Sequence, residues 1–89
     1  MIEIAFSSSF KRAFKRRIAG DVKYEEQFRT KLELFKNNPF EPKLKTHKLS
    51  GKIKDYSLVV SDAETPIIFY FAEKEKAVFV DIGAHKEVY

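Results

Sequence analysis

The chain has 89 residues, a formal net charge of +4 and a hydrophobic fraction of 44%, with nine Phe and four Tyr, which suits one domain spanning residues 1–89 around an aromatic core. It contains no cysteine, which excludes disulfides, cysteine-based zinc sites and thiol catalysis. No apolar run approaches the roughly 20 residues needed to cross a bilayer, and residues 1–6 lack the pattern of a signal peptide, so we expect a soluble cytoplasmic protein without membrane attachment.

The first elements along the chain are a short strand and a helix. Apolar side chains alternate over residues 2–6, which predicts the strand. Three serines at 7–9 then offer a hydroxyl that can cap the free amides of a helix start. The predicted helix has one apolar stripe with basic side chains turned outward. The stripe consists of Phe10, Phe14 and Ile18.

A second helix is predicted after a tight turn. Gly20 can adopt the left-handed conformation that ends the first helix, and Asp21 can cap the next one. Residues 37–39, Asn-Asn-Pro, end the second helix because proline cannot continue the backbone ladder. We therefore expect two antiparallel helices. The apolar stripe of the second consists of Tyr24, Phe28, Leu32 and Phe35.

The second half of the chain changes to the period of strands. Residues 56–61 alternate, with one face more apolar than the other. Residues 67–71 are apolar on both faces and are expected at the centre of the sheet. After a polar turn at 73–76, residues 77–82 return as another strand. This order predicts an α+β fold in which the N-terminal strand and two helices precede an antiparallel sheet, with the helix pair on one face.

Charge is segregated along the chain. Basic side chains gather at residues 11–17 and 43–54, and acidic ones at 25–33 and 62–75. This segregation favours a nucleic acid or an acidic protein as partner over a neutral metabolite, without distinguishing the two. The histidines lie at 47, within a lysine-rich loop, and at 85. Imidazoles move protons near neutral pH and clustered lysines attract phosphate, which indicates a protein equipped to bind and cut a polyanion.

Two motifs carry a family resemblance. Residues 47–54 read His-Lys-Leu-Ser-Gly-Lys-Ile-Lys, similar to a loop of the form H-x-L-x-G, and residues 80–89 end the chain with Gly-Ala-His-Lys-Glu-Val-Tyr, similar to G-x-H-x-x-V/L-Y/F. With these motifs, its length and its element order, the chain resembles the RelE/ParE superfamily of toxins from bacterial toxin–antitoxin systems. It is closest to the RelE and YafQ-like ribonuclease branch. The terminal motif is the more specific of the two.

The resemblance implies a RelE-like fold and a function. Members of this branch cleave mRNA on the ribosome: the 2′-hydroxyl attacks the adjacent phosphate and leaves a 2′,3′-cyclic phosphate and a free 5′-hydroxyl. The reaction needs no metal or other cofactor, only a base, an acid and cations for the charged phosphorane. The resemblance also implies a cognate antitoxin as partner, with operator DNA bound only through that antitoxin.

The same resemblance implies catalytic roles for three residues. His85 is expected to act as general acid or base, and His47 to transfer a proton as well. Tyr89 is expected to stack on a base or to orient the reactive phosphate through its hydroxyl. Each has a plainer interpretation: a surface or core imidazole for His85, a solvated loop imidazole for His47, and packing at the end of the sheet for Tyr89.

The lysines and arginines are candidate RNA contacts. Those near His47 are expected to bind substrate or ribosomal RNA phosphates, where each neutralised phosphate releases counterions, although such runs are also typical of solvated loops. The outward face of the first helix is expected to contact ribosomal RNA or the antitoxin. The first group consists of Lys45, Lys48, Lys52 and Lys54, and the second of Lys11, Arg12, Lys15 and Arg16.

One position departs from the family pattern. Many relatives carry an arginine at the start of the central strand, where it stabilises charge in the transition state. Here Pro66 takes that place, and proline donates nothing to an anion. A second hypothesis therefore stands beside the ribonuclease: a non-catalytic ParE-like toxin that binds DNA gyrase, or a degenerate member that binds only antitoxin and operator DNA. The paired histidines favour the ribonuclease.

Overall fold

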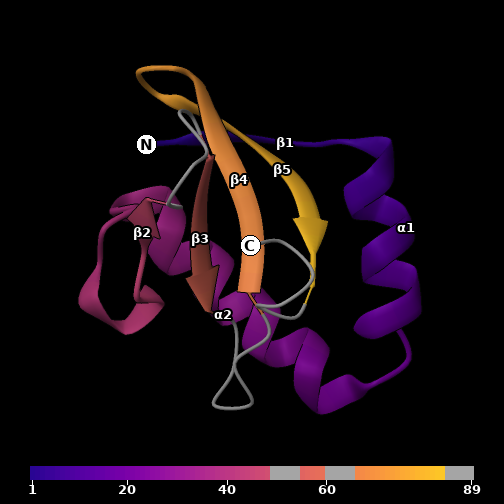
Figure 1. The fold of residues 1–89 in the computed structure, drawn as a ribbon. Coiled ribbons are helices and arrows are strands. Elements are labelled where there is room, and N and C mark those ends of the chain that lie inside the picture. Colours follow the sequence, from indigo (N-terminus) through magenta and orange to yellow (C-terminus); the bar gives the residue numbers. More distant parts are fainter. Residues whose placement is uncertain (49–54, 60–65, 84–89) are drawn as a thin grey trace.

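The structure is a computed structural model and describes residues 1–48, 55–59 and 66–83. Two helices pack against a five-stranded sheet whose strand order is β1-β5-β4-β3-β2 (Figure 1). The elements, in chain order, are β1 (Glu3–Phe6), α1 (Ser8–Arg17), α2 (Val22–Asn37), the short 3₁₀ helix η1 (Pro42–Leu44), β2 (His47–Lys48), β3 (Asp55–Val59), β4 (Pro66–Glu73) and β5 (Lys76–Ile82).

The sheet is mixed. β2, β3, β4 and β5 pair antiparallel in turn, whereas β1 lies parallel to β5, with Glu3 opposite Lys76 and Phe6 opposite Phe79. The predicted α+β architecture and the central place of β4 are thus confirmed, but the expectation of a purely antiparallel sheet is wrong. Parallel strands can pair only when a long connection joins them. Such a connection exists here, because both helices and three strands separate β1 from β5 along the chain.

The two helices begin at the caps expected from the sequence. Ser7 Oγ accepts a hydrogen bond from the Phe10 amide at 3.1 Å, and Asp21 Oδ1 accepts one from the Tyr24 amide at 3.1 Å. Gly20, in the turn between the helices, has a φ of +94°, which a side chain would strain. α1, which precedes this turn, lies beside β5, and α2, which follows it, crosses the sheet obliquely (Figure 1).

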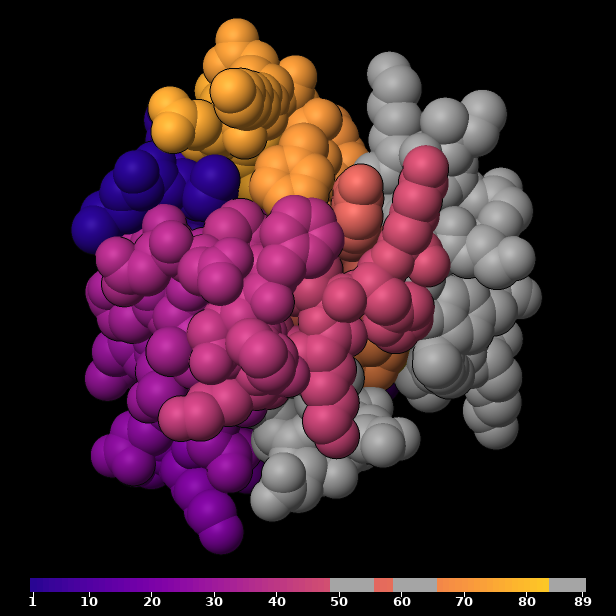
Figure 2. Space-filling view, turned by 90° about the vertical axis from the view of Figure 1, so that its left-hand side faces the viewer, coloured from indigo at the N-terminus to yellow at the C-terminus, as the bar shows by residue number. Residues whose placement is uncertain are grey.

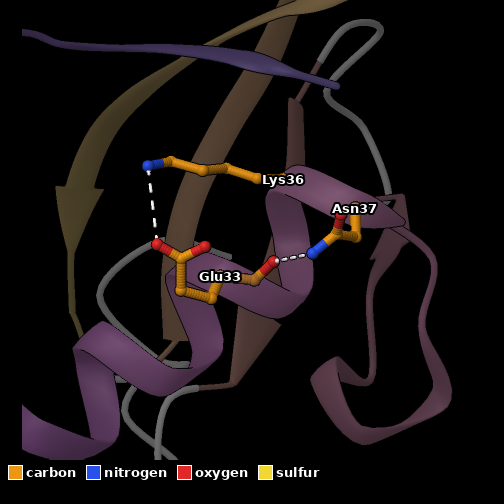
Figure 3. Close-up of polar contacts among 3 residues, drawn as sticks. All are labelled: Glu33, Lys36 and Asn37. Carbon is orange, nitrogen blue, oxygen red and sulfur yellow. Dashed lines mark hydrogen bonds and ion pairs between the residues drawn. The ribbon is translucent and has the colours of Figure 1, made fainter.

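Side chains of α2 interact with one another and with the backbone at the C-terminal end of this helix (Figure 3). The side-chain amide of Asn37 donates a hydrogen bond from Nδ2 to the backbone carbonyl oxygen of Glu33 at 3.0 Å, and Lys36 Nζ lies 3.8 Å from Glu33 Oε1. The ion pair is largely exposed and therefore contributes little. The chain leaves the helix at Asn38, whose φ of −159° is extended, and continues into Pro39, as predicted.

The core lies between the helices and one face of the sheet. The Phe79 ring on β5 lies 5.5 Å from the ring of Phe10 on α1 and 5.3 Å from that of Phe35 on α2, centroid to centroid. Both helices therefore cover the same face. The predicted apolar stripes are confirmed, because every member is buried in this core or packs against it. Phe35, Phe69 and Phe79 are the largest fully buried side chains of the described residues.

A bulge in β5 joins the sheet to α1. Ile68 lies opposite Asp81 and Phe69 lies opposite Phe79, so Val80 is the extra residue. An extra residue disrupts the ladder locally. The Val80 carbonyl oxygen accepts hydrogen bonds from Ser9 Oγ at 2.6 Å and Ser7 Oγ at 3.3 Å. The serines predicted to cap α1 thus also attach this helix to the sheet.

Candidate functional site

The segment between α2 and β2 positions the first predicted site residues. Leu44 is fully buried, and the Thr46 hydroxyl donates a hydrogen bond to the Pro39 carbonyl oxygen at 2.6 Å. Lys31 Nζ on α2 donates to the Lys43 carbonyl oxygen at 3.1 Å. Figure 2 shows the segment as part of the surface between α2 and β3. These contacts fix the stretch on both sides of Lys45.

His47 lies on a strand, where the sequence predicted a loop. It belongs to β2 and pairs with Ser57 on β3, while Lys48 pairs with Tyr56. The expectation of a loop at this position is wrong because the backbone of two residues joins the edge of the sheet. His47 itself is exposed. An edge strand holds its side chains in a more defined direction than a loop does.

A row of residues crosses the sheet on the face opposite the helices. His47 on β2, Ser57 on β3, Ile68 on β4 and Asp81 on β5 are successive partners in the strand register. Their chain neighbours Tyr56, Phe69 and Ile82 belong to the helix-covered core or pack against it, so alternation assigns the row to the other face. Strands lie about 4.8 Å apart, which puts His47 and Asp81 roughly 14 Å apart, too far for a direct hydrogen bond.

Ser57 is the residue of this row that contacts His47. Its Oγ lies 3.3 Å from Nε2 and 3.5 Å from Nδ1 of the imidazole, and only 1% of Ser57 is exposed. A buried hydroxyl without a partner costs about 1–3 kcal/mol. On its other side, His47 Nδ1 lies 3.2 Å from the Lys45 carbonyl oxygen. The imidazole is therefore held between a backbone carbonyl and a buried hydroxyl.

The two lysines beside His47 are placed differently. Lys45 is exposed and has the left-handed conformation, with φ of +53° and ψ of +38°. Lys48 is exposed as well, but the alternation of β2 turns it toward the side of Tyr56, opposite to His47. Lys45 thus contacts the imidazole of His47 through its backbone carbonyl oxygen. Lys48 lies on the other face of the strand, where Phe40 packs against Tyr56.

The basic face of α1 lies at a distance from His47. All four predicted contacts on this helix, Lys11, Arg12, Lys15 and Arg16, are exposed. The helix packs on β5, next to the β1 edge of the sheet, whereas β2 forms the opposite edge (Figure 1). Among the described residues, the basic face of α1 and the lysines beside His47 therefore form separate surfaces.

An apolar hollow adjoins the basic face of α1. It has a volume of about 220 Å³ and lies where the end of β1 meets both helices. Phe6 at its rim is 37% exposed. The lining consists of Phe6, Phe10, Lys11, Phe14 and Phe28. Aromatic side chains beside a lysine suit a partner that presents an apolar group next to an acidic one.

Pro66 begins β4 and is buried. It pairs with Val59, and its carbonyl oxygen accepts a hydrogen bond from the Gly83 amide at 3.2 Å. The first position of a strand is one of the few that tolerate proline. The residue expected to be an arginine in relatives thus serves the sheet backbone here and contributes no charge.

Several predicted site residues lie outside the described residues. These are His85, Tyr89, Lys52 and Lys54. Within the described ranges, no group of three or more His, Cys, Asp or Glu side chains is placed to hold a metal ion. None of the helices in those ranges is both long and apolar enough to span a membrane.

Ser57 and Asp81 were not singled out from the sequence. A weak signal exists, since each is a polar residue inside an otherwise apolar strand pattern. What the sequence lacks is the register that aligns Ser57 with His47 across ten residues of chain and with Asp81 across β4. The same register separates Lys48 from His47.

No protein-family model matches the sequence, and no curated protein does so either. Solved structures do match over nearly the full length. A YoeB/ParE toxin from Agrobacterium tumefaciens has a TM-score of 0.76 at 15% identity, covering 94% of this chain and 99% of that chain. YafQ from E. coli strain BL21(DE3) has a TM-score of 0.71 at 18% identity, covering 100% and 99%.

A third match is a heterotetrameric complex of the YoeB-YefM toxin-antitoxin from Staphylococcus aureus, with a TM-score of 0.73 at 18% identity, covering 96% of this chain and 98% of that chain. At these identities the likeness concerns the fold. The helix pair and the five-stranded mixed sheet of this chain match the fold of these toxin structures. The chain therefore has the fold of the YoeB, YafQ and ParE-type toxins, which is that of the RelE/ParE toxin superfamily expected from its sequence.

Proposed function

We propose that this protein is the toxin of a type II toxin–antitoxin system and acts as a ribosome-dependent endoribonuclease. The observation that carries the proposal is the combination of a toxin fold with an exposed, oriented imidazole. His47 stands on the edge strand of that fold, beside the cationic Lys45. The net charge of +4 suits a polyanionic substrate.

The proposed reaction is metal-independent cleavage of mRNA. The 2′-oxygen forms a bond to the adjacent phosphorus while the bond from phosphorus to the 5′-oxygen breaks. A base takes the proton of the 2′-hydroxyl, and an acid gives one to the departing 5′-oxygen. His47 and His85 supply these two functions in the proposal, the role of His85 resting on the terminal motif. Positioned proton transfer typically contributes about 10²–10⁴-fold.

A cell-free translation assay with primer-extension mapping tests the activity. Cuts within ribosome-bound message are expected with the protein as it stands, and no cuts with His85→Ala. Because that change removes only an imidazole in the proposed reaction, antitoxin binding should persist in the variant. Full cleavage by His85→Ala would remove His85 from the mechanism.

The proposed protein partner is a cognate antitoxin, through which operator DNA would also be bound. The Staphylococcus aureus neighbour was solved as a toxin-antitoxin complex, and this chain offers an apolar hollow beside a strongly basic helix. A short acidic protein encoded beside this gene should copurify with it. Purification of the protein with no such companion, when both genes are expressed together, would contradict this part of the proposal.

Pro66 favours a second candidate function. With a buried proline in place of the arginine expected in nucleases of the family, a ParE-like toxin that binds DNA gyrase without cleaving RNA is the alternative, as is a degenerate member that binds only antitoxin and operator DNA. Inhibition of gyrase supercoiling with translation unaffected would support the ParE-like alternative. Cleavage of ribosome-bound message with supercoiling unaffected would support the ribonuclease.

A further inference from the structure

β1 forms one edge of the sheet, and its outer side has no partner strand among the described residues. On its inner side, the amides of Glu3 and Ser7 donate hydrogen bonds of 2.8 and 3.0 Å to carbonyl oxygens of β5 and of the turn before it. Backbone groups of successive residues in a strand point to opposite edges. Ile4 and Phe6 therefore direct their amides outward, away from β5.

The free part of this edge is short. The Ile2 amide also points away from β5, but it donates to the Lys36 carbonyl oxygen at the end of α2, at 2.9 Å. Within the parts of the chain that the structure describes, the amides of Ile4 and Phe6 have no such acceptor. Both residues are partly open to solvent. An unpaired row of strand amides is a template for the backbone of another strand.

The apolar hollow described above adjoins the same edge, because Phe6 belongs to both. The Phe6 ring stacks on the ring of Phe10 at a centroid distance of 5.3 Å, with 22° between the two planes. Side chains of paired strands lie directly opposite each other, about 4.5–5.5 Å apart. An apolar side chain of an added strand, placed opposite Phe6, would therefore reach the hollow of about 220 Å³.

α1 supplies positive charge at this place. The helix has no acidic residue, and Lys11 lines the hollow itself. Lys15 follows Lys11 by one helical turn, as Arg16 follows Arg12, and like charges at this spacing destabilise a helix. The helix thus carries charges that its own stability does not favour and that an acidic partner would neutralise.

These features together favour a protein segment over RNA. RNA can neutralise α1, but it lacks the alternating amides and carbonyls that continue a β-ladder. We propose that the β1 edge binds an extended, acidic peptide segment of a partner protein by strand addition, with one apolar side chain in the hollow and acidic side chains beside Lys11. The inference goes beyond the functions proposed above, because it concerns a binding mode of this edge and depends neither on RNA cleavage nor on the identity of the partner.

Amide exchange tests the edge in the free protein. In nuclear magnetic resonance spectra, the Ser7 amide should exchange with solvent more slowly than those of Ile4 and Phe6, because it is bonded to β5. Slow exchange of Ile4 and Phe6 at every protein concentration would overturn the proposal, since the edge would then be occupied within the chain. Slow exchange at high concentration alone would also overturn it, by identifying a second copy as the occupant.

Short peptides selected from a displayed random library on the folded protein are the probes of binding. We expect the enriched sequences to alternate apolar residues and to carry acidic ones. In the complex, exchange of the Ile4 and Phe6 amides should slow by roughly tenfold or more, because hydrogen bonds to the peptide protect them. No enrichment, or enriched peptides that leave both amides unprotected, would overturn strand addition.

N-methylation of a selected peptide separates strand addition from docking by side chains alone. Only alternate amides of an added strand face β1, so methyl groups on that set should abolish binding, whereas methyl groups on the intervening set should leave most of it. Equal losses from the two sets would contradict a β-ladder. A single-stranded RNA oligonucleotide should leave the Ile4 and Phe6 amides unprotected, and protection by it would overturn the choice of a peptide.

Charge reversal tests the acidic character of the peptide. Lys11→Glu should weaken binding of the selected peptide by about fivefold or more, and by less at high salt. Lys43→Glu is the matched control, because it changes the net charge equally at an exposed position in η1, which precedes the opposite edge strand β2. Equal losses in the two variants would overturn the placement of acidic side chains beside the hollow.

Discussion

Truncation of Phe35 should test whether one aromatic cluster holds the helices to the sheet. Phe35 is fully buried, and its ring meets those of Phe69 and Phe79 edge to face, with centroids 5.0 and 5.3 Å away. Phe35→Ala removes the buried ring, which typically costs about 3–5 kcal/mol. The free energy of unfolding of a native protein is typically about 5–15 kcal/mol, so Phe35→Ala should remove a large share of the total stability.

Phe40→Ala is the matched control. The chemical change is the same, but Phe40 is 54% exposed and its ring meets those of Tyr56 and Phe71 at longer centroid distances of 6.0 and 6.1 Å. With about half of the ring in water and weaker ring contacts, we expect a loss of about 1 kcal/mol, within the range of ordinary substitutions.

Urea unfolding followed by far-ultraviolet circular dichroism measures both losses, by linear extrapolation of the free energy of unfolding. If Phe35→Ala leaves too little folded protein, Phe35→Leu should still lose more stability than Phe40→Ala. Equal losses in the two positions would refute the inference that the contacts of Phe35 with Phe69 and Phe79 join α2 to the sheet.

Three further predictions concern the caps, the strained lysine and the charges. Ser7→Ala should lower the free energy of unfolding by about 0.5–2 kcal/mol, because it removes the α1 cap and the hydrogen bond to Val80; urea unfolding beside Ser8→Ala, which keeps both, checks this. Lys45→Gly should raise the melting temperature slightly relative to Lys45→Ala, because glycine adopts the φ of +53° without strain, and thermal unfolding compares the two. Lys11→Gln with Lys15→Gln should flatten the salt dependence of binding to ribosomal RNA, by up to about 0.7–0.9 in the logarithmic slope for each phosphate that α1 no longer neutralises; an unchanged slope in a filter-binding titration would exclude this face of α1 from RNA binding.

Local signals in the sequence were sufficient for the helices and for the centre of the sheet. Ser7 and Asp21 cap helices where they were expected to, because a cap involves groups only three residues apart. The apolar stretch that became β4 indicated a strand buried on both faces, and residues 66–69 are indeed buried. Nothing distant in the chain is needed to recognise these features.

The candidate site was only partly predictable. Residue type and motif identified His47, Lys45 and Lys48 as candidates. Their relative placement could not be predicted, because the pairing of β2 with β3 turns Lys48 away from His47. Ser57 was passed over, since a single serine in a strand pattern is only a weak signal until its neighbour across the sheet is known.

The order of residues alone was enough to define the two helices and where they begin, the longer strands, and which side chains enter the core, because periodicity and caps act over a few residues. The three-dimensional fold was needed to establish that β1 runs parallel to β5, that α1 and His47 lie at opposite edges of the sheet, and that a buried hydroxyl meets the imidazole. These relations depend on pairing between strands that are distant in the chain, and a shift of one residue in any pairing would turn every side chain of that strand to the other face.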